Sequence, residues 1–94
     1  MNDRICMVAK MRIESVEPSI HTRSERLVMR AVAASSYPAD GADEENTFAR
    51  WTPSARLDIS ITNPELLGRF RAGRKMYLYF AEVDDGQVPE DREG

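Results

Sequence analysis

The sequence predicts a small, mainly β fold, which we expect to be a five-stranded barrel or sandwich with one short helix before the last strand. Residues 56–62 and 75–83 each alternate apolar and polar side chains, and a capped segment at 63–70 lies between them. A third alternating stretch opens the chain at residues 4–16. Such alternation is typical of a strand with one face on a core. The 94 residues make one domain, which we place at 1–83, before an acidic tail at 84–94.

The first strand is predicted over residues 4–16, because its apolar residues stand at odd positions and its later charged residues at even positions. Residues 17–24 are expected to form a connection, since Pro18 lacks the N–H that a central strand needs. The next stretch, 25–33, fits either a strand or a helix, because Ala and Met are good helix formers. We predict a strand, because the flanking loops suit a meander.

A long acidic loop is predicted at residues 34–46, where Ser, Pro, Gly and carboxylates dominate. Loops of this length are either functional or mobile. A short third strand is expected at 47–52, with Phe48 and Trp51 as its anchors. The fourth strand, 56–62, has the cleanest alternation in the chain.

The segment 63–70 begins like a helix. Its Asn-Pro-Glu start supplies a side-chain cap, a proline suited to the first helical position and an acid suited to the helix dipole. Gly68 is expected to end the helix after about one turn, and Gly73 to adopt a positive φ before the last strand, 75–83. Three apolar side chains should plug one end of the sheet: Leu66, Leu67 and Phe70.

The net charge of −3 is unevenly placed, since residues 82–94 hold six of the 16 acidic residues and one of the 13 basic ones. This end is expected to be a solvated tail, with an acidic arm that docks on a basic partner as the alternative. The sequence has no apolar run near the length of a membrane span and no signal-peptide pattern. We therefore expect no membrane partner. The lone Cys6 fits synthesis in a reducing cytoplasm.

No residue pattern points to catalysis, a metal or a cofactor. A zinc site needs three or four ligands, and the chain has one Cys and one His. The acidic loop lacks the EF-hand pattern, so we expect it to be solvated rather than to bind calcium. Cys6, among apolar neighbours, is expected to be a buried or half-buried inert thiol, and His21 an exposed residue. We predict that the protein is not an enzyme.

Basic and aromatic side chains gather near the last strand. Basic groups beside stacking aromatics on a small barrel are typical of single-strand nucleic-acid binding, but the acidic end after the tyrosines would weaken phosphate binding. Tyr, Trp and Arg also anchor protein interfaces. A third interpretation is that both faces of the last strand are covered within one sandwich. We predict a protein-interaction surface made by Trp51, Arg69, Arg71, Arg74, Tyr77 and Tyr79.

Several motifs resemble small proteins of tailed bacteriophages and prophages. They are the run Glu45-Asn46-Thr47-Phe48, the Thr52-Pro53 and Asn63-Pro64 dipeptides, and Phe70-x-x-Gly73 before an aromatic strand. The resemblance covers about residues 8–83, and the chain departs from it by its longer 34–46 loop and by Ala55 where a glycine is common. It implies a phage gene product of no established activity. Such a protein would be made in the host cytoplasm and could act in the virion, for example at its head.

We therefore expect a non-catalytic bacteriophage structural or accessory protein that acts through protein–protein contacts. Its expected partners are capsid or other virion proteins, or copies of itself. The alternative is a small OB-like barrel that binds single-stranded nucleic acid.

Overall fold

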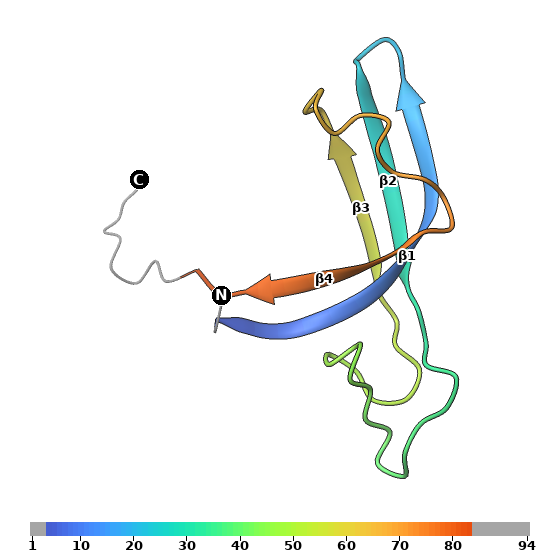
Figure 1. Ribbon diagram of the computed structural model, residues 1–94, viewed down its shortest axis with the longest axis vertical. Helices are drawn as coiled ribbons and strands as arrows, with labels where there is room; N and C mark the ends of the chain where they lie inside the picture. The colour runs from blue at the N-terminus through green and yellow to red at the C-terminus, as the bar shows by residue number, and fades with distance from the viewer. Residues whose placement is uncertain (1–3, 84–94) are drawn as a thin grey trace.

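In the computed structural model, the chain forms one open antiparallel sheet of four strands (Figure 1). The strands are β1 (Ile5–Ser19), β2 (Ser24–Ala31), β3 (Arg56–Ile61) and β4 (Lys75–Ala81), and their order across the sheet is β3-β2-β1-β4. The structure describes residues 4–83, so the predicted tail at 84–94 lies outside the described residues.

The sheet is sharply bent, because β1 pairs with different strands along its 15 residues. Its first part, as far as Arg12, pairs with β4, and the part from Met11 onward pairs with β2. Register shifts between Ile5 and Met7 and between Ile13 and Ser15 mark bulges, which bend and twist a strand. Figure 1 shows the result: β4 and the first half of β1 swing away from β2 and β3.

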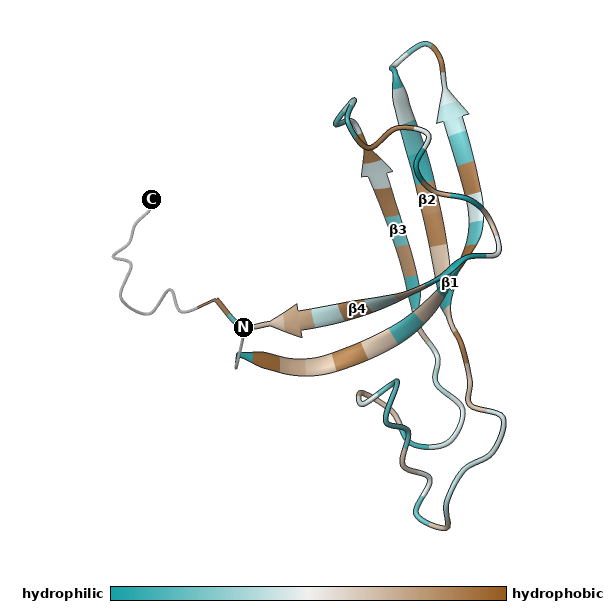
Figure 2. Cartoon of the chain, viewed as in Figure 1, coloured by the Kyte–Doolittle hydropathy of each residue, from teal (hydrophilic) through white to brown (hydrophobic). Residues whose placement is uncertain are grey.

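Most of the buried apolar residues of the strands share the concave side of this bend; Val28, which pairs with Asp58, is buried on the other face. Paired residues in adjacent strands point to the same face, and the pairs Met11–Met76 and Ile13–Met29 join β1 to both neighbours on that side. Figure 2 shows the corresponding brown bands along the strands. The buried core consists of Ala9, Met11, Ile13, Leu27, Met29 and Ile61, and the predicted plug of Leu66, Leu67 and Phe70 packs against it.

The predicted five-stranded barrel or sandwich is wrong, although the mainly β class is confirmed. The expected strand at 47–52 does not form, because Trp51 has a φ of 63°, outside the β region, and only an isolated bridge joins Ala42 to Arg50. The two edge strands, β3 and β4, lie at opposite sides of the sheet. Within residues 4–83, therefore, no strand closes the sheet into a barrel.

The predicted helix at 63–70 is also wrong, since the described residues contain no helix. The segment instead makes turns, with Leu66 N donating to Asn63 O (2.9 Å) and Arg69 N to Leu66 O (3.2 Å). Gly68 has a φ of 80°, in the left-handed region, so the backbone leaves the helical conformation after this first turn. The Asn63 side chain still accepts a hydrogen bond from Glu65 N (3.0 Å), so its capping role survives without a helix.

Strand boundaries differ from those predicted. The stretch at 25–33 is the strand β2, so the helix alternative is wrong. β1 continues through Pro18, where a connection was expected. The proline is tolerated because β4 pairs with β1 only as far as Arg12, which leaves β1 an edge strand at that point. Gly73 has the predicted positive φ, 94°.

Candidate interaction surface

The predicted interaction residues lie in three separate places. The arginines line a hollow of about 170 Å³ beside Phe70 and Met76. The tyrosines project from the other face of β4, where Tyr77 pairs with Lys10. The tryptophan lies in the loop between β2 and β3. The three groups are Arg69, Arg71 and Arg74; Tyr77 and Tyr79; and Trp51.

The loop between β2 and β3 is fixed to β1 by a buried asparagine. The side chain of Asn46 is fully buried. Its Oδ1 accepts a hydrogen bond from Lys10 N (2.8 Å), and its Nδ2 donates to Val32 O (2.8 Å) and to Asp43 Oδ2 (3.2 Å). Asp43, itself buried, also accepts a bond from Asn46 N (3.1 Å). This residue was missed in the sequence, where it falls at the end of a loop that we expected to be solvated.

The next residue continues the contact with β1. Thr47 N donates to Val8 O (3.0 Å), and Val8 N donates to the Thr47 hydroxyl (2.9 Å). Beyond Ala31, where β2 has ended, Asn46 and Thr47 thus take the place of a neighbouring strand. The first half of β1 is therefore bonded on both sides, by β4 and by this loop.

An ionic contact ties the same loop to the tyrosine face of β4. Glu45 Oε1 lies 3.1 Å from Lys10 Nζ, and Tyr77 donates its hydroxyl to Glu45 Oε2 (2.7 Å). Two hydrogen bonds lower the pKa of Glu45: the bond from Tyr77 has the larger effect and the bond from Lys10 the second largest. The same carboxylate raises the pKa of Tyr77 and of Lys10 through these hydrogen bonds.

The two tyrosines form a half-open aromatic pair. Their ring centroids lie 6.1 Å apart, and the Tyr79 side chain is the more exposed of the two. Trp51 belongs to a different cluster, with its ring 6.0 Å from that of Tyr37 and stacked closely on Gly41. A Cβ on Gly41 would come within 2.5 Å of the indole. The tryptophan therefore shapes the loop rather than extending the tyrosine pair.

An apolar groove runs along the concave side between β4 and the start of β3. It encloses about 260 Å³. Its apolar lining includes Met7, Met11, Phe48, Leu57, Leu78 and Phe80. Phe80, Met76 and Ile59, all on this concave face, remain 40%, 36% and 43% exposed.

The opposite, convex face of β2 and β3 is charged. Arg26 Nε donates to Asp58 Oδ1 (2.9 Å), and Arg30 lies 2.9 Å from Glu14. The hydrogen bond from Arg26 lowers the pKa of Asp58. These pairs are exposed to solvent, and exposed ion pairs contribute little to stability. On β2 and β3, the two faces thus differ in chemistry, mainly apolar on the concave side and mainly charged on the convex side.

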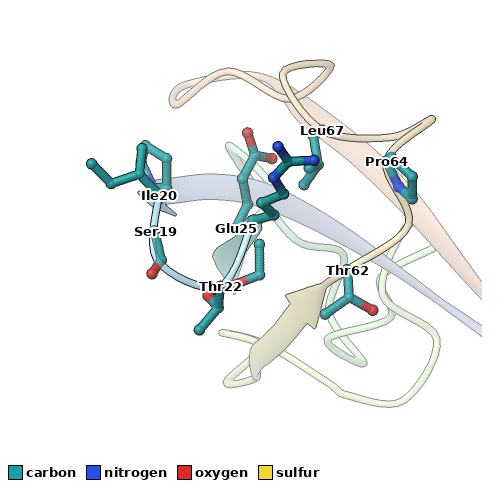
Figure 3. A pocket seen from close by; sticks show the side chains of 10 residues that line it. Ser19, Ile20, Thr22, Glu25, Thr62, Pro64 and Leu67 are labelled. Carbon is teal, nitrogen blue, oxygen red and sulfur yellow. Dashed lines mark hydrogen bonds between the residues drawn. The ribbon is translucent and has the colours of Figure 1, made fainter.

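A second cavity, of about 620 Å³, opens at the far end of the sheet. Figure 3 shows Ser19, Ile20 and Thr22 on one side of it and Thr62, Pro64 and Leu67 on the other, with Glu25 between them. Glu25 is 7% exposed and accepts a hydrogen bond from Gly68 N (2.8 Å). Its Oε1 is buried and has no partner within the described residues.

The two residues considered for chemistry, Cys6 and His21, are both exposed. Cys6 is exposed, which corrects the prediction of a buried thiol: it stands at the bulge of β1, and its Sγ donates to Phe80 O (3.4 Å). His21 is exposed, as predicted. Residues 4–83 hold no cluster of three or more potential metal ligands, and no helix among them is long and apolar enough to span a membrane.

Comparison with known proteins adds no relative: no family model, curated protein or solved structure matches the chain.

Proposed function

We propose that the chain is a non-catalytic structural or accessory protein that acts through protein–protein contacts. The observation that supports this most is the incompletely covered apolar side of the sheet. Small soluble proteins rarely leave a contiguous apolar face open, and such faces mark interaction sites. Here the groove of about 260 Å³ continues into half-exposed Phe80 and Met76 on one strand.

The energetics favour a partner on the concave side. Fully burying a Phe or Met side chain contributes about 1.5–3 kcal/mol, so covering the exposed parts of Phe80, Met76 and Ile59 would add on the order of 1 kcal/mol each. The charged convex face offers no comparable gain, because its ion pairs are already formed in solvent. A chain this small buries a modest share of its surface, and a partner that binds the folded form stabilises it by mass action.

Photo-crosslinking tests this proposal directly. A photoreactive phenylalanine analogue replaces Phe80 in the full chain, and a matched variant carries it at Ser60, an exposed residue that pairs with Arg26 on the convex face. We expect discrete protein adducts from position 80 and none from position 60. Equal labelling from both positions, or no adduct from either, would contradict the proposal.

The place of action follows from the resemblance to tailed-phage proteins. It supports a chain made in the host cytoplasm that contacts capsid or other virion proteins. Mass spectrometry of purified particles tests this part separately. We expect the chain at a defined copy number per particle; its absence from particles and from any stable complex would remove the virion role.

Single-strand nucleic-acid binding remains the second candidate, favoured by the arginine hollow next to Phe70. The carboxylate of Glu45 opposes it, because it already binds the Tyr77 hydroxyl and the Lys10 ammonium that would otherwise be available to a nucleic acid. Fluorescence anisotropy with a labelled oligonucleotide at low salt decides between them. Binding that weakens with salt and on Arg74→Ala or Tyr77→Ala would favour this candidate, and unchanged anisotropy would remove it.

A further inference from the structure

Among residues 4–83, no strand pairs with the outer edge of β4. In an antiparallel ladder, successive residues direct their N–H and C=O groups alternately to the two sides. The Arg74 carbonyl accepts a bond from Ile13 N (2.8 Å), and Glu82 N donates to Arg4 O (3.2 Å). Even-numbered residues therefore direct these groups toward β1. The odd-numbered residues of β4 direct theirs away from the sheet, at an edge that no strand within residues 4–83 covers.

This edge lacks the features that usually prevent strands from pairing. Exposed edges are commonly protected by charges, prolines or bulges. β3, at the opposite edge, carries Arg56 and Asp58. β4 is regular along its length, because both register shifts fall in β1, and its one charge, Lys75, stands at its first position. Its remaining residues include two tyrosines and a phenylalanine, which are among the best strand formers.

We propose that two copies of this chain associate through β4, with the two strands antiparallel about a two-fold axis at Leu78. Leu78 is the central residue of β4. This register places outward-directed residues opposite outward-directed residues, so their backbone groups can bond as a regular ladder. Every facing pair is compatible in size and charge: Leu78 with Leu78, Tyr77 with Tyr79, Met76 with Phe80, and Lys75 with Ala81.

Charge complementarity supports the same register. One step beyond each end of β4, the axis at Leu78 brings Arg74 of one copy opposite Glu82 of the other, and it does so twice. Both side chains are exposed. Within one chain they are separated by the length of β4, about 26 Å, and cannot reach each other. Opposite charges that face each other across a strand pair stabilise it, and like charges destabilise it.

The pairing would also join the two concave faces. Met76 and Phe80, which are half-exposed in one chain, would each be covered by the other residue of the second copy. An edge contact of seven residues buries less than the roughly 800 Å² per partner of a standard interface. We therefore expect a reversible dimer with a dissociation constant on the order of 10 µM.

This inference deepens the proposed function by naming a second copy as a partner, and rests on it. The test is sedimentation velocity of the full chain from about 1 to about 500 µM, a range that brackets the expected constant. Four proteins are compared: the natural sequence, Arg74→Glu, Glu82→Arg, and the variant with both changes. Far-UV circular dichroism checks that each is folded, which we expect because both side chains lie on the surface.

The natural sequence should dimerise, and each single reversal should weaken the dimer about tenfold or more, because it sets two pairs of like charges opposite each other. The double reversal should restore the constant to within about threefold of the natural one. A chain that stays monomeric throughout, or a dimer whose strength ignores these changes, would overturn the inference. If the inference fails in this way but the photoreactive analogue at position 80 crosslinks to a different protein, the proposed function stands without self-association.

Discussion

Removing the side chain of Asn46 should destabilise the fold more than any other single polar truncation among the described residues. Asn46→Ala deletes the three hydrogen bonds of a fully buried side chain, to Lys10 N, Val32 O and Asp43. Each contributes about 1 kcal/mol net, and a buried group left without a partner adds a penalty of about 1–3 kcal/mol. We therefore expect a loss of about 4–6 kcal/mol, out of roughly 4–12 kcal/mol for a fold of this size.

Urea unfolding measures this loss with two reporters. Trp51, the one tryptophan of the chain, reports on the loop, and far-UV circular dichroism reports on the sheet. With a urea slope of about 1 kcal/mol per molar, the midpoint should fall by about 4 M or more. The matched control is Asn63→Ala, which removes one exposed hydrogen bond to Glu65 N and should cost less than about 1 kcal/mol. An Asn46→Ala variant within about 0.5 kcal/mol of the natural chain would refute the reasoning.

Two further predictions concern the same loop. Gly41→Ala should destabilise it and shift Trp51 fluorescence, because φ is 77° and the new Cβ would meet the indole at 2.5 Å. Gly68→Ala, at a φ of 80° with no atom nearby, should show only the backbone strain of about 1–2 kcal/mol. The lowered pKa of Glu45 should stabilise the fold above pH 4.5, its ordinary value, and this is lost as pH falls through the lowered pKa. The raised pKa of Tyr77 should stabilise the fold below pH 10, its ordinary value, and this stabilisation is lost as pH rises through the raised pKa. Urea midpoints measured across pH should test both effects. In the Glu45→Gln variant, the midpoint should depend less on pH on both the acid and the alkaline side.

Strands were predictable from the sequence wherever local alternation decided them. Residues 56–62 and 75–83 contain β3 and β4, since each strand has one apolar face that must meet the core. The apolar segment around Leu67 and Phe70 was also assigned correctly to the core. These features depend on neighbours in the chain, which periodicity records.

Features that depend on distant residues were not predictable in this way. Asn46 contacts Lys10, 36 residues away, and nothing in an acidic loop marks one asparagine as buried. The bulge at Cys6 turns that thiol outward despite its apolar neighbours. The openness of the sheet depends on which strands become its edges, and this is set by the divided pairing of β1.

The predicted interaction surface shows the same division. The arginine cluster is local in sequence, and the structure keeps it together in one hollow. Trp51 is close to that region only in the chain, and its positive φ turns it onto Gly41 instead. The concave groove escaped the sequence because it combines side chains such as Met7, Leu57 and Phe80 from three strands.

Amide hydrogen exchange resolved to single residues tests the central claim most directly, because that claim is an edge strand open to a protein partner. In dilute solution, Tyr77 and Tyr79 amides should exchange at least about tenfold faster than those of Leu78 and Phe80, which are directed toward β1. At high concentration the two tyrosine amides should become protected. Equal protection of all four amides in the dilute chain would show that the edge is already covered, and the account would be wrong.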